Sequence, residues 1–134
     1  MHSTKIVTSF IKNNNKLLIL KRSDKVRSMR GLWSGISGII EKDEVPLERA
    51  KIEIYEEVGL VENNIRLVKF IEKMQINSPQ YENHKWTVFP FLFETDKSSI
   101  KLNWENSDFK WIDIDKLKNY ETVPSLQKVL FNLL

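Results

Sequence analysis

Three glutamates near the middle of this 134-residue chain, Glu53, Glu56 and Glu57, have a spacing that could serve chemistry. Residues three and four apart share one face of a helix, so the three carboxylates would lie together. They repel one another there, and the helix dipole disfavours anions in the C-terminal half of a helix. A bound divalent cation would offset both costs, because Mg²⁺ prefers oxygen ligands. The cluster therefore predicts a metal site, with a solvated acidic helix face as the alternative interpretation.

The helix expected to position these glutamates spans residues 46–58. Pro46 suits its first position, where the N–H that proline lacks is not needed. An apolar stripe recurs at helical spacing and consists of Leu47, Ala50, Ile54 and Val58. Gly59 suits the left-handed residue that ends a helix. The sequence thus predicts an amphipathic helix whose glutamate face lies about 110° from its buried stripe.

The rest of the chain predicts a mixed sheet and a second helix. The expected strands cover residues 5–11, 16–21, 65–76, 86–94 and 109–114. Asn13, Asn14 and Asn15 indicate a hairpin turn between the first two strands, and a polar loop over 77–85 joins the next two. An amphipathic helix is expected over 124–133. Strands with two separated helices favour an α+β fold with a helix on each face of the sheet.

Composition sets outer bounds on function. A chain of 134 residues fits one domain, residues 1–134, and its lack of cysteine excludes disulfides and thiolate chemistry. Residues 1–30 hold eight basic residues and one acidic residue, whereas residues 41–57 hold seven acidic and three basic ones. A basic region beside an acidic one suits a polyanion held through bridging cations, although two solvated faces are the plainer interpretation. The longest apolar run near the start, residues 17–20, is too short for a signal sequence or a membrane span, so we expect a cytoplasmic protein without a membrane partner.

Glycine and glutamate together form one extended motif. Its members are Gly38, Glu44, Glu53, Glu56, Glu57 and Gly59. Their spacing resembles the box of the Nudix, or MutT-like, hydrolase family, and the preceding run over 33–38 resembles the family's entry into that box. The resemblance extends over essentially the whole chain. It implies a Nudix-type α/β/α sandwich with a mixed sheet between helices.

The resemblance also implies a metal site and its ligands. In Nudix hydrolases the box binds Mg²⁺ or Mn²⁺ against a diphosphate. Carried onto this chain, Glu53, Glu56 and Glu57 become metal ligands and catalytic residues, with one of them as general base. The backbone carbonyl of Gly38 would join them, whereas Glu44 would support the loop.

Residues outside the box are expected to complete the site. Glu105 lies where some family members carry a further metal-binding glutamate, with a surface loop residue as the alternative. Arg22 is expected to bind a substrate phosphate, and Arg30 is a second candidate. Trp33 flanks the expected cleft and is a candidate for contact with the substrate, whereas most other aromatic residues are expected in the core.

One position departs from the family pattern. The box expects an arginine that orients the catalytic glutamates, and this chain has Ile52 there. Arg49 lies four residues before Glu53 on the same helical face, so our hypothesis is that Arg49 supplies the missing cation.

The function implied is Mg²⁺-dependent hydrolysis of a nucleoside diphosphate linked to another group. A nucleoside triphosphate that yields a monophosphate and pyrophosphate is the leading substrate class, and dinucleoside polyphosphates and ADP-ribose stay open. The alternative is a nucleotide-binding sensor that has lost turnover, suggested by Ile52. A third reading is an RNA 5′-end hydrolase that uses the basic residues within 1–30, although nucleic acid is not the expected partner. A homodimer is among the assembly states that the sequence leaves open.

Overall fold

The computed structural model describes residues 2–77 and 84–134, and its strands form one mixed sheet. The strands are β1 (His2–Asn13), β2 (Lys16–Arg22), β3 (Trp33–Ser34), β4 (Ile36–Ile39), β5 (Ile65–Phe70), β6 (Met74–Asn77), β7 (His84–Thr95) and β8 (Asn106–Asp113). The helices are α1 (Pro46–Val58) and α2 (Leu126–Leu133), with 3-10 turns η1 (Glu62–Asn64) and η2 (Ile114–Asn119). No helix in these described ranges is long and apolar enough to cross a membrane.

The centre of the sheet is a parallel pair, β1 and β7, which runs from His2 opposite His84 to Lys12 opposite Glu94. On its other side β1 forms an antiparallel hairpin with β2, and β4 also pairs antiparallel with β1. Asn14 adopts φ +55° in the hairpin turn, a conformation that asparagine tolerates. The predicted hairpin is therefore confirmed, and the glycine-rich run after it forms two short strands, β3 and β4, that were not predicted.

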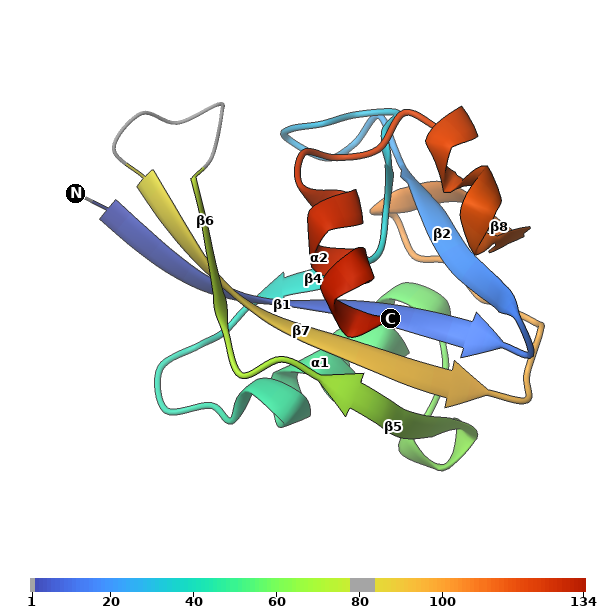
Figure 1. Cartoon of the computed structure of the whole chain (residues 1–134), viewed down its shortest axis with the longest axis horizontal. Coiled ribbons are helices and arrows are strands. Elements are labelled where there is room, and N and C mark those ends of the chain that lie inside the picture. Colours follow the sequence, from blue (N-terminus) through green and yellow to red (C-terminus); the bar gives the residue numbers. More distant parts are fainter. Residues whose placement is uncertain (1, 78–83) are drawn as a thin grey trace.

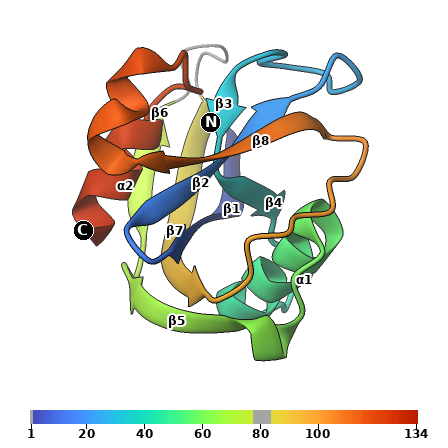
Figure 2. The same ribbon diagram turned by 90° about the vertical axis from the view of Figure 1, so that its right-hand side faces the viewer.

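Two helices cover opposite faces of this sheet (Figures 1 and 2). Ala50, Ile54 and Val58 of α1 are buried against Val7 and Ile11 of β1. The residues buried on the other face include Phe10 of β1, Leu92 of β7, and Leu126, Val129, Leu130 and Leu133 of α2. Because successive side chains of a strand point to opposite faces, β1 serves both cores. This arrangement confirms the expected α+β sandwich.

The helix of the motif has the predicted bounds, Pro46–Val58. Gly59 ends it with φ +77°, and its N–H donates to the carbonyl of Tyr55 at 3.0 Å. This left-handed conformation is strained for a residue with a Cβ, so glycine is required here. The position and phase of α1 fix where its glutamates lie.

The single strand predicted over 65–76 is wrong, because the structure divides it into β5 and β6. Both pair with β7, β5 from Phe91 onward and β6 up to Val88. Pro90 lies between these stretches, and its carbonyl accepts the N–H of Ile71. On that edge of β7, Pro90 has no N–H to donate, so a continuous partner strand would lose a hydrogen bond there.

Candidate active site

The three predicted glutamates of α1 differ in burial. Glu53 and Glu57 are 9% and 4% exposed, whereas Glu56 lies on the exposed surface. Asn106 at the start of β8 donates its Nδ2–H to Glu57 Oε1 at 3.2 Å. The second oxygen, Oε2, is buried and has no hydrogen-bond partner among the described residues. A buried carboxylate oxygen without a donor is costly, so this position is suited to a ligand that supplies positive charge.

Glu105 joins these glutamates from the segment just before β8. Burial raises its pKa, while Arg22 lowers it and Glu56 raises it further. Two backbone contacts hold the segment: Ser23 donates its N–H to the Glu105 carbonyl at 2.8 Å, and its hydroxyl donates to the Trp104 carbonyl. The structure therefore brings Glu105 into electrostatic contact with the α1 glutamates.

Burial and the repulsion within this cluster both raise the pKa values of the two buried glutamates, Glu53 and Glu57. Burial raises the pKa of Glu57 well above its ordinary value, and the negative charges of Glu105 and Glu53 add to the effect. Burial also raises the pKa of Glu53, with further contributions from Glu56 and Glu105. Four carboxylates thus share a small region whose negative charge is only partly compensated.

Gly38 of β4 passes directly beside Glu53. A Cβ built at Gly38 would overlap the carboxyl group of Glu53, so any larger residue would displace that carboxylate. Because Gly38 has no side chain, the backbone of β4 can approach the Glu53 carboxyl group closely. Gly38 therefore lies in close contact with Glu53, and a role for its carbonyl as a metal ligand stays a prediction.

Arg49 lies between Glu44 and Glu53. Its Nε and Nη2 donate to the two carboxylate oxygens of Glu44 at 2.9 and 2.6 Å, and its Nη1 donates to Glu53 Oε1 at 3.3 Å. Hydrogen bonding from Arg49 lowers the pKa of Glu44, and the same contact raises the pKa of Arg49. Ile52, by contrast, is 40% exposed.

This donor set fits a divalent cation in chemistry. Every candidate ligand is an oxygen, and one buried oxygen of Glu57 has no partner within residues 2–77 and 84–134. A bound cation would also relieve the repulsion among the carboxylates. In the ranges 2–77 and 84–134, no three acidic, histidine or cysteine side chains are already gathered closely enough to hold a metal. The fit therefore rests on the type and the unsatisfied charge of the donors.

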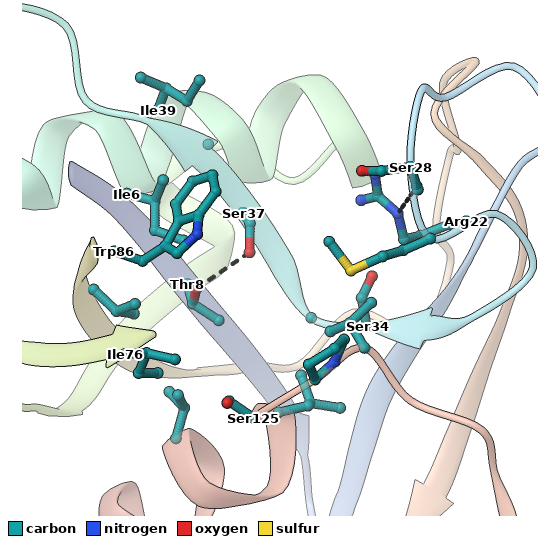
Figure 3. A pocket seen from close by; sticks show the side chains of 18 of the residues that line it. Ile6, Thr8, Arg22, Ser28, Ser34, Ser37, Ile39, Ile76, Trp86 and Ser125 are labelled. Carbon is teal, nitrogen blue, oxygen red and sulfur yellow. Dashed lines mark hydrogen bonds between the residues drawn. The ribbon is translucent and has the colours of Figure 1, made fainter. Parts of the chain in front are cut away.

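A pocket of about 380 Å³ adjoins the carboxylate cluster. Arg22, Glu105 and Gly38 line the end nearest the glutamates, together with Ser28 and Met29. The end away from Arg22 is apolar and includes Ile6, Ile76 and Trp86, as Figure 3 shows. Further apolar lining residues are Ile39 of β4, Val88 of β7, and Leu126 and Val129 of α2. Figure 3 shows Trp86 and Ile6 at one end, Arg22 and Ser28 at the other, and the hydrogen-bonded hydroxyls of Thr8 and Ser37 between them.

The structure brings Arg22 to this pocket but not Arg30 or Trp33. Arg30 is exposed, and its Nε donates to the Val26 carbonyl. Trp33 is 8% exposed and packs edge-on against Tyr120, with the ring centroids 5.3 Å apart. The residues that follow Trp33, Ser34 and Gly35, line the pocket, whereas Trp33 itself does not.

Two residues of the site were not predicted from the sequence: Trp86 was among the aromatic residues expected in the core, and Asn106 was not considered. Trp86 reaches the pocket because β7 pairs in parallel with β1, a contact between distant parts of the chain. Asn106 contacts Glu57 although 49 residues separate them. The polar loop predicted over 77–85 falls mainly on residues 78–83, which lie outside the described residues.

Comparison with known proteins identifies the class. A model of the NUDIX domain matches residues 2–133. The chain is 28% identical over 141 residues to a dihydroneopterin triphosphate diphosphatase of Haemophilus influenzae, a match that covers 96% of this chain and 87% of that protein. It is 33% identical over 125 residues to an RNA pyrophosphohydrolase of Bartonella tribocorum, covering 76% and 67%. A MutT Nudix hydrolase structure from Burkholderia pseudomallei superimposes with a TM-score of 0.77 over all of both chains, at 19% identity.

The chain therefore belongs to the Nudix family, as the motif indicated. Within that family it is a pyrophosphohydrolase, a hydrolase that acts on phosphoric anhydrides.

Proposed function

We propose that this enzyme uses Mg²⁺, or Mn²⁺ in its place, to hydrolyse the diphosphate linkage of a nucleotide-like compound. The leading substrate class is a nucleoside triphosphate, or a triphosphate on a related ring, which yields a monophosphate and pyrophosphate. The observation that carries this proposal is the undercompensated carboxylate cluster at the charged end of the pocket. An acidic cluster beside a phosphate-binding arginine is suited to holding a polyphosphate through a divalent cation.

Each residue of the site has a proposed role. Glu53, Glu56 and Glu57 would hold the cation with the carbonyl of Gly38, and Glu105 would complete the set. When bound, the cation supplies neutralising charge for the phosphates and makes a bound water more acidic. One of the α1 glutamates accepts the proton of the attacking water, while the bond between phosphorus and the bridging oxygen breaks. Arg22 lines the pocket and binds a phosphate of the substrate.

The apolar end of the pocket supports a substrate that carries a ring. Trp86 offers an indole face among aliphatic side chains, an environment that stabilises a planar heterocycle. Among the described lining residues the charged ones, Arg22 and Glu105, lie at the other end, so hydroxyls such as those of Thr8 and Ser37 are the groups available to contact ring edges. The relative named for dihydroneopterin triphosphate is consistent with a triphosphate attached to a ring.

A substrate panel tests this function directly. The purified protein is incubated with Mg²⁺ and nucleoside triphosphates, dihydroneopterin triphosphate, ADP-ribose, a dinucleoside polyphosphate and an RNA with a 5′-triphosphate, and the products are separated. We expect pyrophosphate release from a triphosphate, and the loss of that release in Glu56→Gln.

The matched control is Glu48→Gln, which makes the same change at an exposed position of the same helix. This variant is expected to retain the parent rate. Equal rates for the parent and Glu56→Gln would contradict the proposed metal site. Thermal stabilisation by a nucleotide without any product would favour the sensor alternative instead.

A further inference from the structure

Arg49 connects two structures that flank the candidate metal site. Its guanidinium donates two hydrogen bonds to Glu44, in the loop that follows β4, and one to Glu53 on α1. The three side chains are largely shielded, with 16%, 22% and 12% of their surfaces exposed for Arg49, Glu44 and Glu53. Among the described residues, Arg49 is the basic side chain that forms an ion pair with Glu53.

We propose that Arg49 is the positioning residue of this enzyme, and that it fixes the Glu53 carboxylate from one helical turn before it. The inference rests on the proposed function, because it takes Glu53 as a ligand of the catalytic cation. Arg49 does not line the pocket, so it acts through Glu53 and not on the substrate. It thereby replaces the arginine that the family pattern expects at position 52, where this chain has isoleucine.

The geometry explains why an arginine is needed at position 49. Two parallel hydrogen bonds to Glu44 fix the plane of the guanidinium, and the remaining Nη1 is then directed at Glu53. A lysine carries a single ammonium on a flexible chain and lacks this planar fork. Arginine can therefore orient Glu53, whereas lysine can only neutralise charge.

Glu44 links Arg49 to the loop that follows β4. One of its carboxylate oxygens accepts the backbone N–H of Glu41 at 2.6 Å, which ties the start of the loop to Arg49. Gly38 lies three residues before Glu41, on β4. Arg49 thus fixes Glu53 on one side of the site and the loop leading from Gly38 on the other.

Position 52 gives an independent way to test this assignment. Ile52 is 40% exposed, so an arginine can be accommodated there without opening the core. If the role of Arg49 is to orient Glu53, then Ile52→Arg introduced into Arg49→Ala supplies a cation at the position expected by the family pattern. A role limited to holding the fold together through Glu44 would not be rescued in this way.

The experiment compares Arg49→Ala, Arg49→Lys and Arg49→Ala with Ile52→Arg in the full chain. We expect Arg49→Ala to lower kcat at least about tenfold and to change KM by less than about threefold, because ground-state binding is made elsewhere. Arg49→Lys stays impaired, and the double variant recovers to within about threefold of the parent. Lys51→Ala is the matched control, because Lys51 lies on the same helix as Arg49 and its ion pair is with Glu62 of η1, so this variant keeps the parent kcat.

A second readout does not depend on turnover. Binding of Mn²⁺ alone, followed by electron paramagnetic resonance, is expected to weaken in Arg49→Ala and to recover in the double variant. Unchanged kcat in Arg49→Ala, or a loss without rescue in a double variant that unfolds at the parent temperature, overturns the inference. If Arg49→Ala fails to fold, Arg49→Lys decides: parent kcat in that variant overturns the proposal.

Glu53→Gln separates this failure from that of the proposed function. Loss of turnover in Glu53→Gln with full turnover in Arg49→Ala would reject the role of Arg49 alone. Full turnover in both variants would reject the metal site itself.

Discussion

The carboxylate cluster and the apolar end of the pocket are built in different ways. Three of the four clustered glutamates come from five consecutive residues of α1, and Glu105 is the distant member. The apolar end is assembled from β1, β4, β6, β7 and the start of α2. The cluster carries charge that the surrounding described residues balance only in part, whereas the apolar end is lined by uncharged side chains, several of them only partly buried. Under the proposed function, catalysis depends on a local, costly arrangement of charge, and substrate selection depends on a surface that several distant elements assemble.

The largest expected effect lies in the cluster. Glu57→Gln removes one charge but keeps an oxygen that can accept the Asn106 hydrogen bond, so the fold is retained. We expect kcat to fall by about a thousandfold, because a ligand of the cation is lost at the centre of the site. Steady-state pyrophosphate release with the preferred substrate measures this. A fall of less than about threefold would mean that Glu57 is outside the catalytic machinery.

The second largest effect on kcat is expected at Gly38 of β4, which lies against Glu53. Gly38→Ala introduces a Cβ that must displace the Glu53 carboxyl group. We expect kcat to fall by about ten- to a hundredfold, since a misplaced ligand costs rate without being removed. Gly31→Ala serves as a contrast, because a Cβ at Gly31 has no atom of the described residues within 4 Å, although its φ of +77° is strained. Equal activity of Gly38→Ala and the parent would show that Glu53 moves without consequence.

A smaller effect is expected at the apolar end. Trp86→Leu removes the aromatic surface of the pocket and keeps an apolar side chain there. The value of kcat/KM should fall about tenfold for a triphosphate on a ring and stay the same for inorganic triphosphate, which has no ring. Phe131→Leu, an exposed aromatic residue of α2, is the matched control. An equal loss with both substrates would show that Trp86 supports the fold and does not select a ring.

The smallest effect is on stability in the absence of metal. Burial and neighbouring carboxylates raise the pKa of Glu57 in the folded state, so the folded protein binds a proton more readily than the unfolded chain. The contribution of Glu57 to the free energy of unfolding is fully present below pH 4.5, the ordinary pKa of a glutamate. This contribution is lost as the pH rises through the folded-state pKa of Glu57. Glu57→Gln should therefore raise Tm at neutral pH by about 3 °C and flatten its decline with pH.

Thermal unfolding with a chelator, recorded between about pH 5 and pH 8, measures this difference. The same variant is thus expected to be both the least active and the more stable one. A lower Tm for Glu57→Gln across that range would contradict the assignment of Glu57 as an uncompensated buried charge.

The sequence predicted what depends on local signals. Pro46, the apolar stripe and Gly59 define α1 to the residue, because capping and periodicity act within one helix. The placement of Arg49 beside Glu53 followed from the same helical spacing. Arg22, which the family resemblance implied as a phosphate-binding residue, lines the pocket, and its binding role stays a prediction.

Features that depend on pairing between distant segments could not be predicted from the sequence. Trp86 enters the pocket through the β1–β7 pairing, which no local pattern indicates. Trp33, next to the glycine-rich run, was expected beside the cleft, yet packing against Tyr120 covers it. The interruption between β5 and β6 follows from Pro90 on another strand, so the composition of residues 65–76 could not reveal it.

The central parallel pair has a consequence for how the molecule forms. His2 lies opposite His84, so β1 can form this pairing only with residues that lie 82 positions later in the chain. Contacts between such distant segments are slow to form, because the intervening chain must be ordered before they contribute. During synthesis α1 leaves the ribosome well before β7, and the sheet against which it packs is then incomplete. Folding of the catalytic region is therefore completed late, and a nascent chain that ends before β7 would lack a stable site.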